Sequence, residues 1–225
     1  MNWLIIICVV VGAMFLMWLY WRLFYFFRDP EREIPSGNNI VAPADGTIVY
    51  ANICDDEYAP VTIKKGKQIR LDEIAKTDLP PGKLCHVGIF MSFFDVHVNR
   101  IPIDGQIEFI KHYKSKNFSM NLMGLRKYWG LKPLYKDSVH IYENERKTVR
   151  INGEIPVYVV QIADAYVSKI VSFVKEGSSQ KKGARFGKIM MGSQVDLIFP
   201  YRDGMKILVS EWDHVKAGEN IIATY

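Results

Sequence analysis

The chain has 225 residues, of which 49% are hydrophobic and 24% charged, and its net charge is +5. This length and apolar content exclude a disordered tail protein and allow one globular domain with an appendage. The surplus of positive charge is compatible with a nucleic acid or an anionic membrane surface as partner. The three cysteines lie far apart in the sequence, which indicates neither a disulfide framework nor a zinc site.

The first predicted element is an apolar helix near the N-terminus. Residues Trp3–Trp21 contain no charged side chain, and a membrane-spanning helix needs about 20 such residues. A cleaved signal peptide is the alternative, but it would have a basic start, a shorter apolar stretch and a small-residue cleavage site. We therefore expect residues 1–28 to be an uncleaved transmembrane or membrane-associated anchor. This favours a membrane, and no nucleic acid, as the partner.

The charges around the apolar run predict its orientation. Arg22, Arg28 and Arg32 follow it closely, whereas no charged side chain precedes it. Such an excess of arginine and lysine is typical of the cytoplasmic flank of a membrane helix. The sequence thus predicts a protein of the cell membrane with its body on the cytoplasmic side.

Residues 29–38, DPEREIPSGN, are expected to form a linker because they contain proline and glycine. Residues 39–225 contain short apolar runs, such as IVAPADGTIVYANI and KTVRINGEIPVYVVQIA, which are rich in valine and isoleucine and broken by Asp-Gly, Asn-Gly and proline. This pattern is typical of strands and hairpins. The predicted fold is mainly β, or β-rich α+β, with a barrel-sandwich-like body.

Two segments of the body allow more than one interpretation. Residues 165–177, AYVSKIVSFVKEG, form either a helix or a buried strand, because periodicity does not separate the two at this length. Residues 118–135, FSMNLMGLRKYWGLKPLY, form either a loop packed on the core or a surface segment that enters lipid. Met, Leu and Trp with interleaved Arg and Lys are favourable at the lipid interface.

Few residues carry an obvious chemical signature. The chain has no G-x-S-x-G elbow, no S-x-x-K after Ser193 and no phosphate-binding glycine loop. Of the histidines, only His97 has a crowded polar setting, since Asp95 and His97 alternate on one face of a predicted strand, and Asn99 and Arg100 follow. Residue types alone are more typical of a plain surface histidine at a strand end than of a catalyst.

Two other positions also have an ordinary structural explanation. Asp45 in VAPADG is typical of a turn, and so are Gly192 and Ser193 between the two apolar runs of FGKIMMGSQVDLIFP. The sharper hypothesis is that the chain breaks at this serine. Spacing alone leaves a membrane-bound β protein of unknown activity.

Five motifs taken together are more specific. FFRDPER, VAPADG, FMSFFDVHVNRIP, YENER and FGKIMMGSQVDLIFP occur in the order and approximate spacing of the short form of phosphatidylserine decarboxylase. The sequence resembles this family from about Phe26 to near the C-terminus. Each motif is weak alone, but five in order are strong.

The resemblance implies a proenzyme that cuts itself between Gly192 and Ser193. Attack of Ser193 Oγ on the Gly192 carbonyl would give an ester, and elimination and hydrolysis would leave a pyruvoyl group in place of Ser193. Chains of residues 1–192 and 193–225 would stay paired as a heterodimer, and two such pairs can form a dimer. The pyruvoyl group would be the cofactor, with no metal, and would accept electrons as phosphatidylserine of an anionic membrane surface is decarboxylated to phosphatidylethanolamine.

The resemblance also implies roles for individual residues. It assigns His97 as the acid/base of decarboxylation and Asp45 as a partner in self-cleavage. Residues expected to line the site or the substrate are Asp95, Asn99, Arg100 and Gln194.

Three departures from the family pattern leave questions open. Arg100 stands where long-form members have a second histidine, so the base for self-cleavage is not identified. Gln194 stands where the short form usually has arginine. In addition, VVQIADAYVSKI replaces a stretch that contains more glycine and arginine. The last two changes affect headgroup recognition or rate in this interpretation.

A function without catalysis is the main alternative. VAPADG and HVKAGENI also resemble the two arms of a biotinyl- or lipoyl-type barrel-sandwich, which would make the chain a membrane-bound carrier. Such a carrier needs a modified lysine at a hairpin tip, and no Met-Lys or Asp-Lys hairpin lies midway. A membrane adaptor without chemistry is a third interpretation. Only the decarboxylase would give two fragments without added protease.

Overall fold

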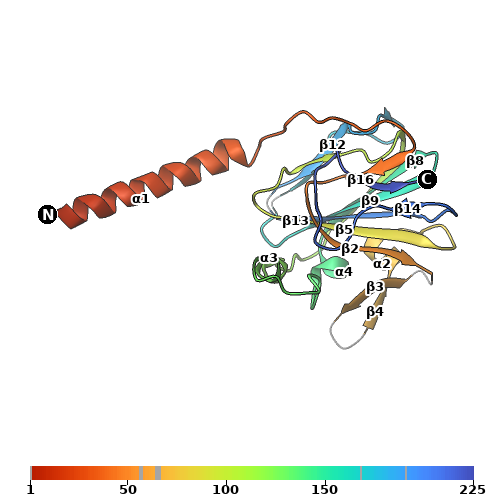
Figure 1. The fold of residues 1–225 in the computed structure, drawn as a ribbon, viewed down its shortest axis with the longest axis horizontal. Helices are drawn as coiled ribbons and strands as arrows, with labels where there is room; N and C mark the ends of the chain where they lie inside the picture. The colour runs from red at the N-terminus through yellow and green to blue at the C-terminus, as the bar shows by residue number, and fades with distance from the viewer. Residues whose placement is uncertain (1, 56–57, 64–66, 168, 191) are drawn as a thin grey trace.

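The computed structural model describes residues 2–55, 58–63, 67–167, 169–190 and 192–225. Its first element is the helix α1 (Asn2–Tyr20), which continues into the π-helical turn η1 (Trp21–Tyr25). Figure 1 shows α1 extending away from the body of the protein. The stretch Trp3–Tyr25 is long and apolar enough to cross a membrane, and its most apolar 18 residues are not buried by the body. The prediction of an N-terminal apolar helix is confirmed.

The body is built on a curled, antiparallel sheet (Figure 1). Its eight strands lie in the order β11 (Ser179–Gln180), β7 (Gly105–Tyr113), β8 (Arg146–Gly153), β9 (Pro156–Ala163), β13 (Ser193–Pro200), β5 (Leu84–Met91), β2 (Gly46–Cys54) and β15 (His214–Val215). β13 thus lies between β9 and β5 in the middle of the sheet.

Smaller sheets and short helices complete the body. The sheets are β1 (Asn39–Val41) with β16 (Ile221–Thr224) and β14 (Lys206–Ile207), β10 (Ile170–Ser172) with β12 (Arg185–Ile189) and β6 (Val98–Arg100), and β3 (Tyr58–Ile63) with β4 (Lys67–Arg70). The helices are α2 (Leu71–Ala75), α3 (Asn121–Tyr128) and α4 (His140–Glu143). The prediction of a mainly β fold is confirmed. Within residues 165–177, the described part contains the short strand β10 and no helix.

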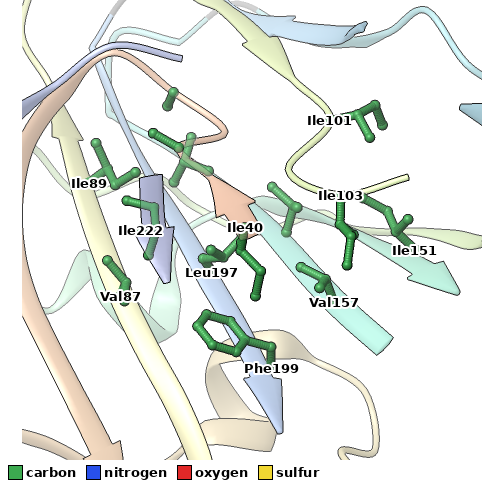
Figure 2. Close-up of a cluster of buried hydrophobic side chains, with 14 of the residues drawn as sticks. Ile40, Val87, Ile89, Ile101, Ile103, Ile151, Val157, Leu197, Phe199 and Ile222 are labelled. Atoms are coloured by element: carbon green, nitrogen blue, oxygen red, sulfur yellow. The ribbon is translucent and has the colours of Figure 1, made fainter. Parts of the chain in front are cut away.

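Hydrophobic clusters cover both faces of the large sheet. Side chains alternate along a strand, and on β13 Val195, Leu197 and Phe199 enter one cluster while Ile198 enters the other. Figure 2 shows the first cluster, where Leu197 and Phe199 pack with β-branched side chains of β5, β8 and β9. Such packing holds β13 in place through its side chains as well as through its two ladders.

Residues 29–38, the predicted linker, have no regular structure but are held against the body. Asp29 forms an ion pair with Arg100, with Oδ1 and Nη2 3.1 Å apart, and Arg32 forms one with Asp45, with Nη2 and Oδ2 2.8 Å apart. These contacts fix the segment that joins the apolar helix to the sheet.

Candidate active site

Three strand ends meet at Ser193. In the register of the large sheet, Ser193 at the start of β13 pairs with Met91 at the end of β5 and with Ala163 at the end of β9. Residues just beyond these ends are therefore brought together, although they lie far apart in the sequence. They include Ser92, Asp164 and Gly192.

Ser193 is fully buried, and its side chain lies on the face of β13 that also carries Val195. Its Oγ contacts Met91 Sδ at 3.3 Å, and Asn99 Nδ2 lies 3.8 Å from the same sulfur. Asn99 Oδ1 in turn accepts a hydrogen bond of 2.7 Å from Gln161 Nε2. Met91 therefore links Ser193 to Asn99, one of the residues predicted to line the site.

Gly192 has a backbone conformation and an environment that require glycine. Its φ of +47° lies in the left-handed region, which side chains other than glycine seldom adopt. A Cβ at this position would stand 2.7 Å from Asp164 Oδ2. The glycine therefore allows the Asp164 carboxyl group to approach the backbone at the predicted cleavage bond.

A cavity of about 550 Å³ opens beside Gly192, and we call it the Gly192 cavity. Apolar side chains from the end of β5 and from α3 dominate its wall, whereas Asp164 and Lys127 carry the charges among its described lining residues. The apolar lining residues are Phe90, Met91, Phe93, Phe94, Met120, Leu125 and Tyr128. The dimensions are those of a small-molecule site.

His97 lies in a different setting from the one predicted. Asp95 and His97 precede β6 in an irregular segment, so the prediction that they alternate on a strand face is wrong. The reason is a turn in which the Ser92 amide and hydroxyl both donate to Asp95 Oδ2, at 2.7 and 2.6 Å. His97 Nδ1 donates to the Asp95 carbonyl at 2.9 Å, and its ring packs on Phe26 with centroids 4.3 Å apart.

The other ring nitrogen of His97 differs from Nδ1. Nε2 is buried and has no hydrogen-bond partner among the described residues. Burial lowers the pKa of His97 to about 4, so the ring is neutral at pH 7 and Nε2 is a free acceptor. His97 lines a second cavity of about 220 Å³, together with Phe26 and Lys188.

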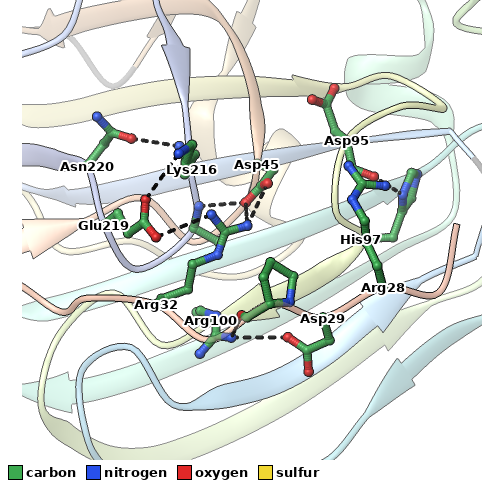
Figure 3. A network of polar contacts seen from close by, with 12 residues as sticks. Arg28, Asp29, Arg32, Asp45, Asp95, His97, Arg100, Lys216, Glu219 and Asn220 are labelled. Carbon is green, nitrogen blue, oxygen red and sulfur yellow. Dashed lines mark hydrogen bonds and ion pairs between the residues drawn. The ribbon is translucent and has the colours of Figure 1, made fainter. Parts of the chain in front are cut away.

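Asp45 and Asp95 occupy separate polar clusters (Figure 3). Asp45 Oδ1 accepts from the Ala217 amide at 2.8 Å, and both its oxygens contact Arg32. Burial raises the pKa of Asp45 despite these contacts. Burial also acts to raise the pKa of Asp95, but hydrogen bonds from Ser92 and His214 outweigh it and leave this pKa lowered. Hydrogen bonds between described residues do not connect either carboxylate to Ser193.

Arg100 is also engaged away from Ser193. Its guanidinium group contacts Asp29 and donates to the Gly183 and Pro30 carbonyls, both at 2.9 Å (Figure 3). These contacts account for its burial and attach the segment after η1 to β6. They support a structural role for arginine at this position.

Gln194 points to the opposite face of β13 and belongs to a fully buried polar group, which we call the closed network. Its members are Tyr50, His86, His140, Gln194 and Asp196. Asp196 accepts from Tyr50 at 2.6 Å and contacts His86 Nε2 at 2.8 Å, while Gln194 Nε2 donates to both Tyr50 and Asp196. Gln194 therefore lies next to Ser193 in sequence but outside the Gly192 cavity.

Comparison with known proteins bears on this arrangement. The family profile described as phosphatidylserine decarboxylase matches residues 19–223. The chain belongs to this family. The predictions of this family and of an enzyme are thereby confirmed.

Individual relatives match most of the chain. A Methanocaldococcus jannaschii protein, provisionally named archaetidylserine decarboxylase proenzyme, is 39% identical over 88% of this chain and 87% of its own. Phosphatidylserine decarboxylase proenzymes of Chlorobaculum tepidum and Azorhizobium caulinodans are 34% and 39% identical, over 88% and 89% of this chain and 75% and 72% of theirs. All three names describe a proenzyme.

The structure brings some predicted site residues together and separates others. Gly192, Ser193 and Asn99 share one neighbourhood around Met91, whereas Asp45, Arg100 and Gln194 each have partners elsewhere. Sequence reasoning missed Asp164, although it stands in the stretch that departs from the short-form pattern. No cluster of three metal-ligating side chains occurs in the described parts of the chain.

Proposed function

We propose that the chain cuts itself between Gly192 and Ser193 and then decarboxylates phosphatidylserine to phosphatidylethanolamine with a pyruvoyl group made from Ser193. The observation that carries this proposal is the Gly192–Ser193 pair itself. It stands at a strand end, beside a cavity, with the glycine in a left-handed conformation. Glycine adopts this conformation without steric cost and leaves its backbone accessible.

The residues around Ser193 fit a pyruvoyl group. Such a group supplies a ketone that condenses with the substrate amine and withdraws electrons as carbon dioxide leaves. A pyruvoyl group lacks the hydroxyl and the backbone N–H of the serine that it replaces. It is therefore smaller and less polar, and the buried position beside Met91 and Ala163 can accommodate it. Asn99, 3.8 Å from the Met91 sulfur, is available to donate a hydrogen bond in this neighbourhood.

His97 is the proposed acid/base of the reaction. Its neutral ring offers a buried Nε2 acceptor that no described residue satisfies, and a buried polar atom without a partner calls for an explanation, of which a catalytic role is one. The Asp95 carbonyl fixes the tautomer by accepting from Nδ1. This role requires the substrate to reach from the Gly192 cavity toward the cavity that His97 lines.

The two chains produced by cleavage would remain associated as a heterodimer. β13 is paired with β5 along its whole length and with β9 over residues 193–198. Val195, Leu197 and Phe199 are fully buried. Cleavage before Ser193 leaves all of these contacts intact.

The proposed substrate reaches the site from an anionic bilayer. Helix α3 contributes to the wall of the Gly192 cavity, and its Leu125 and Tyr128 are 56% and 81% exposed, as is Trp129 directly after the helix at 69%. Arg126 and Lys127 lie on the same helix, and basic residues near a bilayer gain up to about 1 kcal/mol each from anionic lipid. We therefore favour the lipid-facing interpretation of residues 118–135, with the body on the cytoplasmic side.

Two lipid classes share the serine headgroup that this site would accept. Relatives are named for phosphatidylserine and for archaetidylserine, which differ in the glycerol backbone and its chains. The wall of the Gly192 cavity that would meet the lipid chains is mainly apolar. Parallel assays with both lipids in the same micelles decide which one is preferred.

The test of the proposal is the mass of the purified full chain in detergent. We expect a C-terminal fragment of residues 193–225 that starts with a pyruvoyl group and is blocked to Edman sequencing. Ser193→Ala should give one uncut, inactive chain, because no hydroxyl remains to attack Gly192. The matched control Ser210→Ala, at an exposed serine, should be cut normally. Quantitative recovery of an active, uncut wild-type chain would contradict the proposal.

A further inference from the structure

Asp164 is a buried carboxyl group without an assigned role, and it lies against Gly192, the residue before the predicted cleavage bond. It follows the end of β9, which the register places beside Ser193. The three atoms nearest to a Cβ built on Gly192 all belong to Asp164. The residue is only 3% exposed and lines the Gly192 cavity.

The two carboxylate oxygens of Asp164 have different surroundings. Oδ1 accepts from the Met120 amide at 3.0 Å and from the Ala165 amide at 2.5 Å, which fixes the orientation of the group. Oδ2 faces Gly192, and none of the described residues donates a hydrogen bond to it. One oxygen is thus held by the fold, and the other is available beside Gly192.

We propose that Asp164 carries the proton in the first step of self-cleavage. The proposal rests on the function proposed above. As Ser193 Oγ bonds to the Gly192 carbonyl carbon, its proton passes to Asp164 Oδ2. The same proton then passes to the Ser193 nitrogen as the carbon–nitrogen bond breaks. The products are an ester and a free amine, the carboxylate returns to its starting state, and no other reactant is consumed.

The electrostatic setting suits this role. Burial raises the pKa of Asp164, against the lowering effect of the two amides, and a carboxylate of raised pKa is a stronger base. Lys127 is the other charged group among the described residues that line the cavity. Asp95, which accepts a hydrogen bond from the Ser92 hydroxyl, has a lowered pKa. Asp45 and Arg100, by contrast, are occupied by Arg32 and Asp29.

The experiment follows the cutting of newly made full chain in detergent by gel electrophoresis and intact mass. Asp164→Asn keeps an oxygen for the two amides but cannot carry the proton, so we expect cutting to slow by about 100-fold or more. Asp164→Glu, which keeps a carboxylate, should be cut faster than Asp164→Asn. The matched control Asp104→Asn also alters a carboxylate that accepts a backbone amide, that of Lys182, and should be cut at the normal rate.

Two further measurements remove ambiguity. The thermal unfolding of Asp164→Asn is compared with that of the uncut Ser193→Ala chain, and equal midpoints show that folding is intact. Hydroxylamine, which cleaves esters, should release no fragment from Asp164→Asn. If misfolding obscures that variant, the wild-type cutting rate decides, since it should rise with pH and then level as Asp164 ionises.

Each outcome has one meaning. A wild-type chain that stays uncut overturns the proposed function together with this role. If the wild type is cut and Asp164→Asn is cut equally fast, only the role of Asp164 is wrong. Release of a fragment with a free Ser193 amine from Asp164→Asn by hydroxylamine also overturns it, because the ester then forms without this carboxylate. A wild-type cutting rate that is independent of pH would also overturn the role of Asp164.

Discussion

The two faces of β13 carry buried polar groups of opposite character around Ser193. On one face, Ser193 adjoins the Gly192 cavity, and Asp164 has an oxygen that no described residue bonds. On the other face, the closed network joins Gln194 and Asp196 to side chains from three other segments. One face is therefore open to a ligand, and the other is bonded internally.

The difference indicates how a strand can be both reactive and rigid at one point. Gln194 Nε2 donates to Tyr50 at 2.8 Å and to Asp196 at 2.7 Å, so the residue directly after the cleavage bond is anchored. After cleavage this anchor would hold the new N-terminus in place. Within the network, His86 Nδ1 is the one buried atom that lacks a partner among the described residues. The predictions below separate loss of reactivity from loss of rigidity.

The largest effect is expected from His97→Ala, which alters the reactive side alone. Turnover should fall by about 100-fold to 10,000-fold, the usual contribution of positioned proton transfer. Activity is measured per processed chain, since the substitution can also slow cutting. The control His112→Ala, at an exposed histidine paired with Glu145, should retain activity. Normal turnover by processed His97→Ala would contradict the role.

The next effect is expected on the closed network. Asp196→Ala leaves Tyr50, His86 and Gln194 without their shared acceptor, and breaking such a buried group costs about 3–5 kcal/mol. The free energy of unfolding is measured by urea denaturation in the uncut Ser193→Ala background, where one chain unfolds.

The control for the closed network is Asp203→Ala in the same background. Asp203 is exposed on a turn, so its replacement should change the free energy of unfolding by less than about 0.5 kcal/mol. Equal stabilities for Asp196→Ala and this control would show that the network does not stabilise the fold.

Gly192→Ala tests the close approach on the reactive side. Alanine costs about 1–2 kcal/mol in a left-handed conformation, and its Cβ would displace the Asp164 carboxylate. We expect cutting to slow by at least about tenfold. Gly124→Ala is the matched control, because it lines the same cavity but its Cβ would meet Phe90 at an ordinary 3.8 Å. Equal cutting rates for the two variants would contradict the proposed geometry.

Local patterns in the sequence were enough to predict the β body, the apolar helix and the strand after Gly192. They failed where distant residues decide the structure. VHV suggests a strand around His97, but two hydrogen bonds from Ser92 to Asp95 form a turn instead. Residues 165–177 were ambiguous, and pairing of Ile170–Ser172 with β12 makes that part a strand.

The site was only partly predictable for the same reason. Gly192 and Ser193 were identified by a motif, which is local. Asp164 reaches Gly192 only through the pairing of β9 with β13, and the motif carries no information about that register. Gln194 was expected at the site because it follows Ser193, yet strand alternation turns it to the other face.

The last prediction compares His97 and His140 by their effect on how the free energy of unfolding depends on pH. Burial lowers the pKa of both His97 and His140 to about 4. Between pH 6.5 and 4 the unfolded chain binds a proton at each histidine and the folded chain does not. These histidines therefore do not reduce the free energy of unfolding above pH 6.5. On acidification below this pH, each lowers it by up to about 1.4 kcal/mol per pH unit.

The measurement is the free energy of unfolding at several pH values in the Ser193→Ala background. His97→Gln and His140→Gln should each flatten its dependence on pH below 6.5, because glutamine binds no proton. Asp45 and Asp164 have raised pKa values and act in the opposite direction, so the difference between each variant and its parent isolates the histidine. His140→Gln should also lower stability at pH 7.5, since His140 Nε2 contacts Gln194 at 3.3 Å, and His97→Gln should lower it through loss of the Nδ1 hydrogen bond to the Asp95 carbonyl. An unchanged slope in either variant would show that its histidine titrates alike in the folded and unfolded chain.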